Sequence, residues 1–214
     1  MSELSKTVQS IVFDLDGTLY VNEGVSHEIE QVACELVALG RGVTTAQGCQ
    51  IVRSTRAKLA EQAGREPALS LVCAELGIDL LDFHQALQDG VRPERYLSDD
   101  KALQHLLGSL AERYRLFIYT NNNYPLVQKI LSLLGVEHLF SHLYTIEFCW
   151  QPKPDSEALD RVLNDIGGPP ESFLFVGDRQ HIDLLPPAER GIATLLVKQT
   201  ADLLQIHKLL GLLH

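Results

Sequence analysis

The chain has 214 residues, 45% of them hydrophobic, and a formal net charge of −10 at pH 7. These values suit one domain with a sizeable insertion, or two small domains, and exclude general disorder. The acidic balance argues against a nucleic acid polymer or an anionic membrane as the main partner, and no apolar run reaches the roughly 20 residues that a membrane span needs.

The first predicted element is a buried strand that ends on two aspartates. Residues 11–13 form a short apolar run, typical of a strand in a parallel sheet. Because strand side chains alternate, Asp14 and Asp16 share a face, and Gly17 lets the chain turn. Two like charges this close are unfavourable unless a cation or a shared proton relieves them. Taken alone, the motif is also compatible with a solvated acidic turn.

The segment from about residue 26 to residue 89 is predicted to be entirely helical. Four stretches carry helical periodicity or helix-end signals: 27–40, 44–64, 67–78 and 80–90. The first places Leu39 on its apolar stripe and is expected to end at Gly40. The second has Thr44 or Thr45 as its cap and ends at Gly64.

After residue 93 the pattern alternates between strands and helices. Strands are predicted within 115–122, 141–148, 172–178 and 191–197, and helices within 99–114, 125–136, 155–168 and 201–214. This alternation predicts an α/β fold with a doubly wound parallel sheet, to which the first strand also belongs. The core domain then comprises residues 1–20 and 93–214, and residues 21–92 form an inserted, all-helical domain.

Three of the predicted strands end in chemically useful residues. Asp14 follows the first strand, Thr120 and Asn121 follow the second, and Asp178 ends the strand at 172–178. The carboxyl ends of parallel strands form the edge at which such sheets bind ligands. Lys153 lies between two prolines just before a predicted helix, which fixes its backbone and suits a counter-charge for an anion.

These motifs resemble the haloacid dehalogenase (HAD) superfamily of phosphatases and phosphotransferases. Four segments match in order: DLDGT at Asp14–Thr18, TN at Thr120–Asn121, KPD at Lys153–Asp155 and GDRQHID at Gly177–Asp183. The resemblance implies a Rossmann-like core, and the insertion is similar to the small helical cap that one subfamily carries after its first motif.

The resemblance also implies a Mg²⁺ cofactor and a covalent mechanism. The Asp14 carboxylate, the Asp16 backbone carbonyl and Asp178 would hold the ion, which relieves the carboxylate repulsion. Asp14 would be the nucleophile that forms an aspartyl-phosphate, and Asp16 the general acid and then the base.

The remaining roles concern the phosphoryl group. Thr120, Asn121 and Lys153 would bind it, Thr120 and Lys153 also as catalytic groups, and Asp183 would orient Lys153 or metal-bound waters. Two positions depart from the motif common in relatives, which reads GDS and has an Asn before the second acidic residue: Arg179 follows Asp178, and Ile182 precedes Asp183. Arg179 would alter the charge balance at the metal or contact the substrate.

The sequence predicts a phosphomonoesterase for a small phosphorylated metabolite. FDLDGTLY and TNNNYPLVQKILSLLGVEHLF are similar to the branch that contains pyrimidine 5′-nucleotidases, which favours a nucleoside 5′-monophosphate. Alternative substrates are phosphoglycolate and a sugar phosphate. A further alternative is that the protein is a HAD-like binding protein without catalytic turnover. Dehalogenation fits less well, since it has no use for metal-binding carboxylates.

Further expectations concern the cysteines, the surroundings of the site and the assembly. Four cysteines without metal-like spacing predict buried, reduced thiols, and with no apolar signal core we expect a cytoplasmic monomer or weak homodimer. Trp150 and Cys149 are expected to pack beneath the lysine loop. His84, Arg53 and Arg56 of the helical insertion could face the substrate, but a solvated helix face is the favoured interpretation for each.

Overall fold

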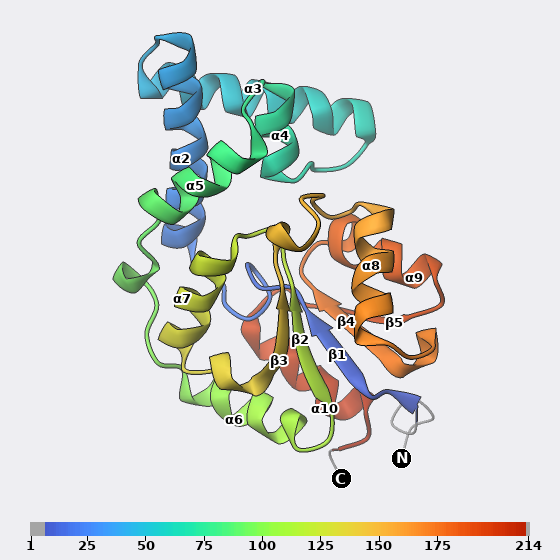
Figure 1. Ribbon diagram of the computed structural model, residues 1–214. Coiled ribbons are helices and arrows are strands. Elements are labelled where there is room, and N and C mark those ends of the chain that lie inside the picture. The colour runs from blue at the N-terminus through green and yellow to red at the C-terminus, as the bar shows by residue number, and fades with distance from the viewer. Residues whose placement is uncertain (1–6, 213–214) are drawn as a thin grey trace.

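The computed structural model describes residues 7–212 and has a five-stranded sheet at its centre (Figure 1). The strand order is β3-β2-β1-β4-β5, and every neighbouring pair is parallel. The strands are β1 (Ser10–Phe13), β2 (Arg115–Tyr119), β3 (Phe140–Tyr144), β4 (Phe173–Gly177) and β5 (Ala193–Leu196). The predicted α/β, doubly wound class is confirmed, and β1 lies at the middle of the sheet between β2 and β4.

Helices cover both faces of the sheet, which explains why its central strands are mostly apolar. The core helices are α6 (Lys101–Ala111), α7 (Tyr124–Leu134), α8 (Ser156–Ile166), α9 (Leu185–Glu189) and α10 (Gln205–Leu209). Ile11 and Phe13 pack in one cluster with α6, α7 and α10, whereas Val12 packs in a second cluster with α8. The alternation of strand side chains thus builds a core on each face.

Four helices lie together beyond the carboxyl edge of the sheet (Figure 1). They are α2 (Glu23–Arg41), α3 (Thr45–Ala63), α4 (Leu69–Glu75) and α5 (Leu80–Gly90), and we call them the cap. Helix α3 begins with a capping box at Thr44 and ends at Gly64, as its sequence predicts. The domain boundaries at residues 20/21 and 92/93 stay a prediction.

The first cap helix is longer than predicted. Helix α2 ends at Gly42, which adopts φ 63°, and not at Gly40. Leu39, which was expected on the buried stripe, is 82% exposed. The stop signal belongs to Gly42 because this glycine supplies the left-handed conformation that closes the helix.

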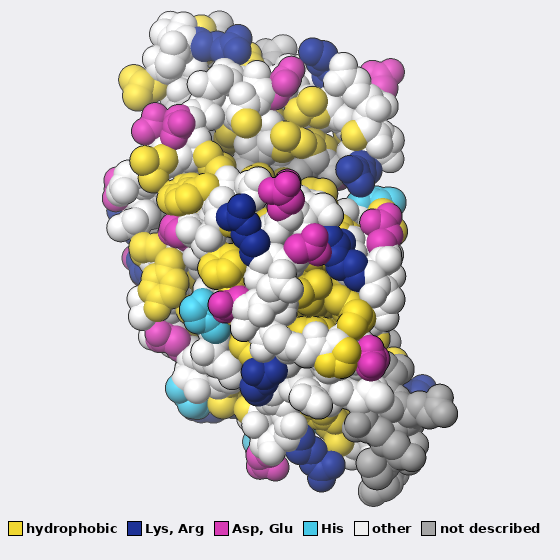
Figure 2. All heavy atoms as spheres, turned by 45° about the vertical axis from the view of Figure 1, so that its right-hand side comes forward, with side chains coloured by type: hydrophobic (Ala, Val, Ile, Leu, Met, Phe, Trp, Pro, Cys, Tyr) yellow, Lys and Arg dark blue, Asp and Glu magenta, His cyan; other side chains and the backbone are white. Residues whose placement is uncertain are grey.

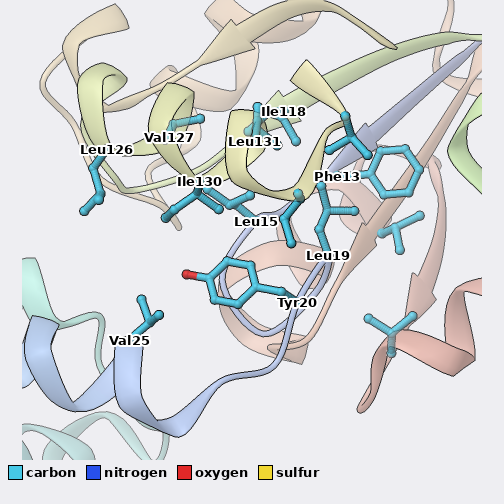
Figure 3. Packing of buried hydrophobic residues seen from close by; sticks show 14 of the residues in the cluster. Phe13, Leu15, Leu19, Tyr20, Val25, Ile118, Leu126, Val127, Ile130 and Leu131 are labelled. Carbon is cyan, nitrogen blue, oxygen red and sulfur yellow. The ribbon is translucent and has the colours of Figure 1, made fainter. Parts of the chain in front are cut away.

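Two crossings join the cap to the core. At the first, Tyr20 packs between the core residues Leu15 and Leu19 and Val25 of α2 (Figure 3), and the Asn22 side chain caps α2. At the second, Glu28 of α2 accepts hydrogen bonds from the Arg92 backbone N–H at 2.6 Å and from the Tyr96 hydroxyl at 3.0 Å. Both crossings therefore converge on the start of α2.

Two other predictions need correction. The stretch 141–148 is a strand only to Tyr144 and continues as a 3₁₀ turn at Ile146–Phe148. The described part of the predicted helix at 201–214 consists of a 3₁₀ segment to Leu204 followed by the short α10, and residues 213–214 lie outside the described residues. No helix in residues 7–212 is long and apolar enough to cross a membrane.

The prediction of four reduced cysteines is wrong for two of them. Cys34 of α2 and Cys49 of α3 form a disulfide, with their Cα atoms 4.5 Å apart. Cys73 is a buried free thiol, and Cys149 is a partly buried one. The pair escaped sequence analysis because its 15-residue separation has no motif and only the packing of α2 against α3 brings the two together.

Candidate active site

The carboxyl edge of the sheet and the cap enclose a cavity of about 350 Å³. The loops after β1, β2 and β4 supply its core wall. That wall includes these residues from the sequence motifs: Asp14, Asp16, Gly17, Thr120, Asn121, Asp178 and Arg179. Asp14 is 4% exposed, and Lys153 and Asp183 are buried directly behind it. The structure therefore brings the predicted site residues together at one edge of the sheet: Asp14, Asp16, Thr120, Asn121, Lys153, Asp178 and Asp183.

Lys153 connects the two most buried carboxylates. Its Nζ donates to Asp14 Oδ1 at 2.6 Å, to Asp183 Oδ1 at 2.8 Å and to the Tyr119 backbone oxygen at 2.8 Å. These three acceptors use all three ammonium hydrogens. The other Asp183 oxygen accepts from the Arg179 backbone N–H at 3.0 Å. Asp183 is thus fully engaged in holding Lys153 and the loop after β4.

Asp16 is held beside Asp14 by residues that sequence analysis did not assign to it. The Tyr20 hydroxyl donates to Asp16 Oδ1, and the Asn122 side-chain amide donates to Asp16 Oδ2 at 3.3 Å. The Asn122 contact joins residues 106 positions apart, and the Tyr20 contact depends on how the chain turns after β1, so spacing alone identifies neither.

The two residues after β2 do different things. Thr120 is buried at the cavity wall, and its Oγ1 accepts from the Asn122 backbone N–H at 3.2 Å. The Asn121 side chain donates to the Lys153 backbone oxygen at 3.1 Å and accepts from the Lys153 N–H at 2.6 Å. The Asn121 amide therefore fixes the lysine loop, although its predicted role was phosphate binding.

Gly17 and Asp178 approach each other closely. Gly17 has φ +87°, and a Cβ at this position would lie 2.5 Å from Asp178 Oδ2, so both the conformation and the contact favour glycine. Asp178 Oδ1 is buried and accepts no hydrogen bond within residues 7–212. One oxygen from each of Asp14, Asp178 and Asp183 lies within 4.8 Å of the other two. Such hard oxygen donors, one of which accepts no hydrogen bond, fit Mg²⁺.

The charges at this corner need a further cation. Burial, with the Asp183 charge adding and Lys153 opposing, raises the pKa of Asp14 to about 7. Burial and Asp183 likewise raise the pKa of Asp178 to about 6. Burial acts to lower the pKa of Lys153, but the carboxylates of Asp14 and Asp183 raise it above its ordinary value. A bound dication would favour the ionised forms of Asp14 and Asp178.

The cap supplies the opposite wall of the cavity, and here two expectations were wrong. His84 of α5 is 3% exposed and lines the cavity. The Arg56 side chain, 28% exposed, also lines it and pairs with Glu30. Only Arg53, with a 70% exposed side chain, is solvated as expected. Helix α5 turns His84 inward because its apolar neighbours pack between α2 and the core.

Trp150 also lies differently from its prediction. Its side chain is 40% exposed, so it does not pack beneath the lysine loop. The indole instead meets the His84 ring edge-on, with the ring centroids 6.3 Å apart. The Asn123 side chain donates to the His84 backbone oxygen at 3.0 Å. The loops after β2 and β3 therefore contact α5 directly.

A model of the haloacid dehalogenase-like hydrolase family matches residues 8–189, and the chain belongs to this family. An (S)-2-haloacid dehalogenase of Pseudomonas putida is 30% identical over 181 residues, which cover 80% of this chain and 76% of that protein. A phosphoglycolate phosphatase of Salmonella paratyphi A is 24% identical over 196 residues, covering 82% and 76%.

A crystal structure of a HAD phosphatase from Thermococcus onnurineus has a TM-score of 0.63 with this chain at 18% identity. The structural match covers 95% of this chain and 98% of the other, so the two proteins share the fold over nearly their whole lengths. The names of these relatives include both a dehalogenase and phosphatases. None of these three relatives is named a pyrimidine 5′-nucleotidase, so they do not support that predicted branch.

Proposed function

We propose that the protein is a Mg²⁺-dependent phosphomonoesterase that acts on a small phosphorylated metabolite through an aspartyl-phosphate. The observation that carries this proposal is the pairing of two differently supported carboxylates. Asp14 is buried against Lys153, whereas Asp16 is held beside it by Tyr20 and Asn122 at the cavity wall. A nucleophile and a separate proton donor are what ester cleavage with a poor leaving group needs.

The reaction then follows in two displacements. In the first step an oxygen of Asp14 attacks phosphorus while the bond between phosphorus and the leaving-group oxygen breaks. The carboxylic acid of Asp16 donates its proton to the leaving-group oxygen. In the second step Asp16 takes a proton from water, the water oxygen attacks phosphorus, and the bond between Asp14 and phosphorus breaks. Inorganic phosphate leaves, and both carboxyl groups return to their starting states. Lys153 holds Asp14 in place throughout.

A bound Mg²⁺ would neutralise charge on the phosphoryl oxygens, and Asp14, Asp178 and the Asp16 backbone carbonyl would hold it. Asp183 is less suited as a direct ligand because both of its oxygens already accept hydrogen bonds. We assign it the positioning of Lys153. Thr120, at the cavity wall, is the residue after β2 best placed to receive the phosphoryl group.

For the substrate we propose a nucleoside 5′-monophosphate, with pyrimidine bases preferred, and a sugar phosphate or phosphoglycolate as the alternatives. The cavity volume of about 350 Å³ falls in the usual range for small-molecule sites. On the face drawn in Figure 2, acidic and basic side chains are interspersed without a large basic patch. This surface and the net charge of −10 disfavour a polymeric anion.

Dehalogenation is the second candidate, because the 30% identical relative is named a haloacid dehalogenase. A carboxylate nucleophile serves both reactions. A departing halide, however, requires neither a proton donor nor a metal. The supported Asp16 and the Asp178 oxygen that accepts no hydrogen bond would have no use in that chemistry, which favours the phosphatase.

An assay with purified protein tests the proposal. We expect phosphate release from p-nitrophenyl phosphate that chelator abolishes and Mg²⁺ restores, and no chloride release from 2-chloropropionate. Among natural esters, a pyrimidine monophosphate should lead AMP, GMP and sugar phosphates by about tenfold in kcat/KM, or about 1.4 kcal/mol. Chloride release without phosphatase activity would contradict the proposal, and a sugar phosphate in front would overturn only the nucleotide preference.

A further inference from the structure

We propose that the cavity selects phosphate esters whose leaving group is uncharged and rich in hydrogen-bonding groups, and that it discriminates against a carboxylate on that group. This inference rests on the phosphatase function proposed above and names the substrate class of the same site. The phosphoryl group must lie at Asp14 to be attacked. The rest of the ester therefore extends away from the sheet edge, toward the cap wall of the cavity.

The cap wall presents polar atoms that have no partner. Ser70 Oγ and both ring nitrogens of His84 are buried and make no hydrogen bond within residues 7–212, and both residues line the cavity. A buried polar atom left unpaired costs about 1–3 kcal/mol. A ligand that supplies donors and acceptors here removes that cost on binding, which makes these two residues determinants of specificity.

The partners that these atoms require are neutral. Burial, opposed by the Glu147 charge, lowers the pKa of His84 to about 4, so its ring is uncharged at pH 7 and offers one donor and one acceptor. The Ser70 hydroxyl offers the same pair of functions. Hydroxyl groups, which donate and accept, match both residues, while a carboxylate only accepts.

The charged side chains of the cavity wall support the same inference. Two guanidinium groups line the cavity, and each is already paired: Arg56 with Glu30 at 3.4 Å, and Arg179 with Asp178 at 3.7 Å. Four carboxylates line the same space, those of Asp14, Asp16, Glu30 and Asp178. A carboxylate on the leaving group would meet Glu30, and the one basic side chain of the cap that lines the cavity, Arg56, is already paired with it. Such like-charge juxtaposition is a common means of rejecting a ligand.

The remaining cap wall is apolar, with Ile29, Phe83 and Leu87 facing the cavity. Apolar walls with a few fixed polar groups suit a carbon skeleton that carries hydroxyls. The cap of this chain therefore differs in chemistry from what the carboxylate of phosphoglycolate would require, although relatives at 24% identity are named for that substrate.

A matched pair of esters tests the inference. 2-Hydroxyethyl phosphate and 2-phosphoglycolate have the same skeleton and differ only in ending in a hydroxymethyl or a carboxylate group. We expect the wild type to favour the hydroxyl ester at least tenfold in kcat/KM. Equal values, or a preference for phosphoglycolate, would overturn the inference. If the enzyme hydrolyses p-nitrophenyl phosphate but neither small ester, their inhibition constants provide the same comparison.

Variants locate the effect. Glu30→Gln releases Arg56 and should raise kcat/KM for phosphoglycolate about tenfold relative to kcat/KM for the hydroxyl ester. Ser70→Ala should lower kcat/KM for the hydroxyl ester severalfold relative to kcat/KM for phosphoglycolate. Glu61→Gln, an exposed change on α3, is the matched control and should not alter the ratio of the kcat/KM values for the two esters. An unchanged ratio in a folded Glu30→Gln protein would contradict the proposed role of the ion pair.

The two proposals fail in different ways. Absence of Mg²⁺-dependent hydrolysis of p-nitrophenyl phosphate would sink the phosphatase function itself. Hydrolysis of that ester together with a preference for the carboxylate ester would sink only the specificity inference.

Discussion

Lys153 is the residue on which the charge balance of the site depends. It is 2% exposed, the two carboxylates it touches are 4% and 5% exposed, and it donates all its ammonium hydrogens. Burying an ion in this way is unfavourable unless the partners are close and complete. The consequence is that Asp14 and Asp183 rely on Lys153 for folding as well as for reactivity.

The variant Lys153→Met tests this dependence. It leaves two buried carboxylates without their counter-charge, so we expect a loss of about 3–5 kcal/mol in the free energy of unfolding at pH 7. The missing cation also raises the pKa of both groups in the folded state. The deficit should therefore shrink as the pH falls and the carboxylates protonate. Urea unfolding at pH 5 and pH 8 measures it.

Lys101→Met is the control for that experiment. Lys101 pairs with Asp99 at 2.8 Å, but its side chain is 80% exposed, and exposed pairs contribute only about 0–1 kcal/mol. A Lys153 variant no less stable than this control would show that the buried ion pair is not needed for folding.

Individual residues also show how far sequence reasoning reaches. Asp14, Asp16 and Asp178 could be predicted to meet because each lies at the end of an apolar strand, and parallel strands end at one edge. Tyr20 and Asn122, which hold Asp16, could not be assigned. Their contacts depend on how the chain turns after β1 and β2, and side-chain direction in such turns is not encoded by spacing.

At the scale of elements, helix α5 carries a buried histidine whose charge state affects the cap. The pKa of His84 is lowered by burial from 6.5 to about 4. Between these values the unfolded chain binds a proton that the folded protein does not, so stability falls as the pH falls through this window. The accompanying loss is about 3 kcal/mol between pH 7 and pH 4.

His84→Gln should remove this part of the acid sensitivity. We expect the difference in unfolding free energy between variant and wild type to move in favour of the variant as the pH falls from 7 to 4. His27→Gln, at an exposed position at the start of α2, is the control and should follow the wild type. Parallel pH profiles for His84→Gln and the wild type would show that His84 does not titrate as a buried neutral ring.

Elements with strong end signals were predictable, and those defined by packing were not. Helix α3 has both its cap Thr44 and its closing Gly64 in the sequence, so its bounds follow from local chemistry. The stretch 201–209 has apolar periodicity but is divided between a 3₁₀ segment and α10. The disulfide between α2 and α3 likewise depends on the approach of two helices, which no periodicity reveals.

At the scale of the whole molecule, the chemistry lies between two parts of the chain with different tasks. The sheet edge holds the reactive carboxylates on short loops from a rigid core. The cap closes the cavity from the other side and presents the groups that meet the leaving group. Under the proposed function, chemistry and specificity are carried by separate segments, so a change in the cap would alter the substrate without altering the reaction.

The covalent intermediate on Asp14 is the central claim, and rapid acid quenching during turnover tests it most directly. With Mg²⁺ and a ³²P-labelled phosphate monoester, we expect labelled protein to form and the label to map to the peptide that contains Asp14. The Asp14→Asn variant should show no label and a rate lower by several orders of magnitude. Phosphate release by the wild type without protein labelling, or a label on another residue, would contradict the account.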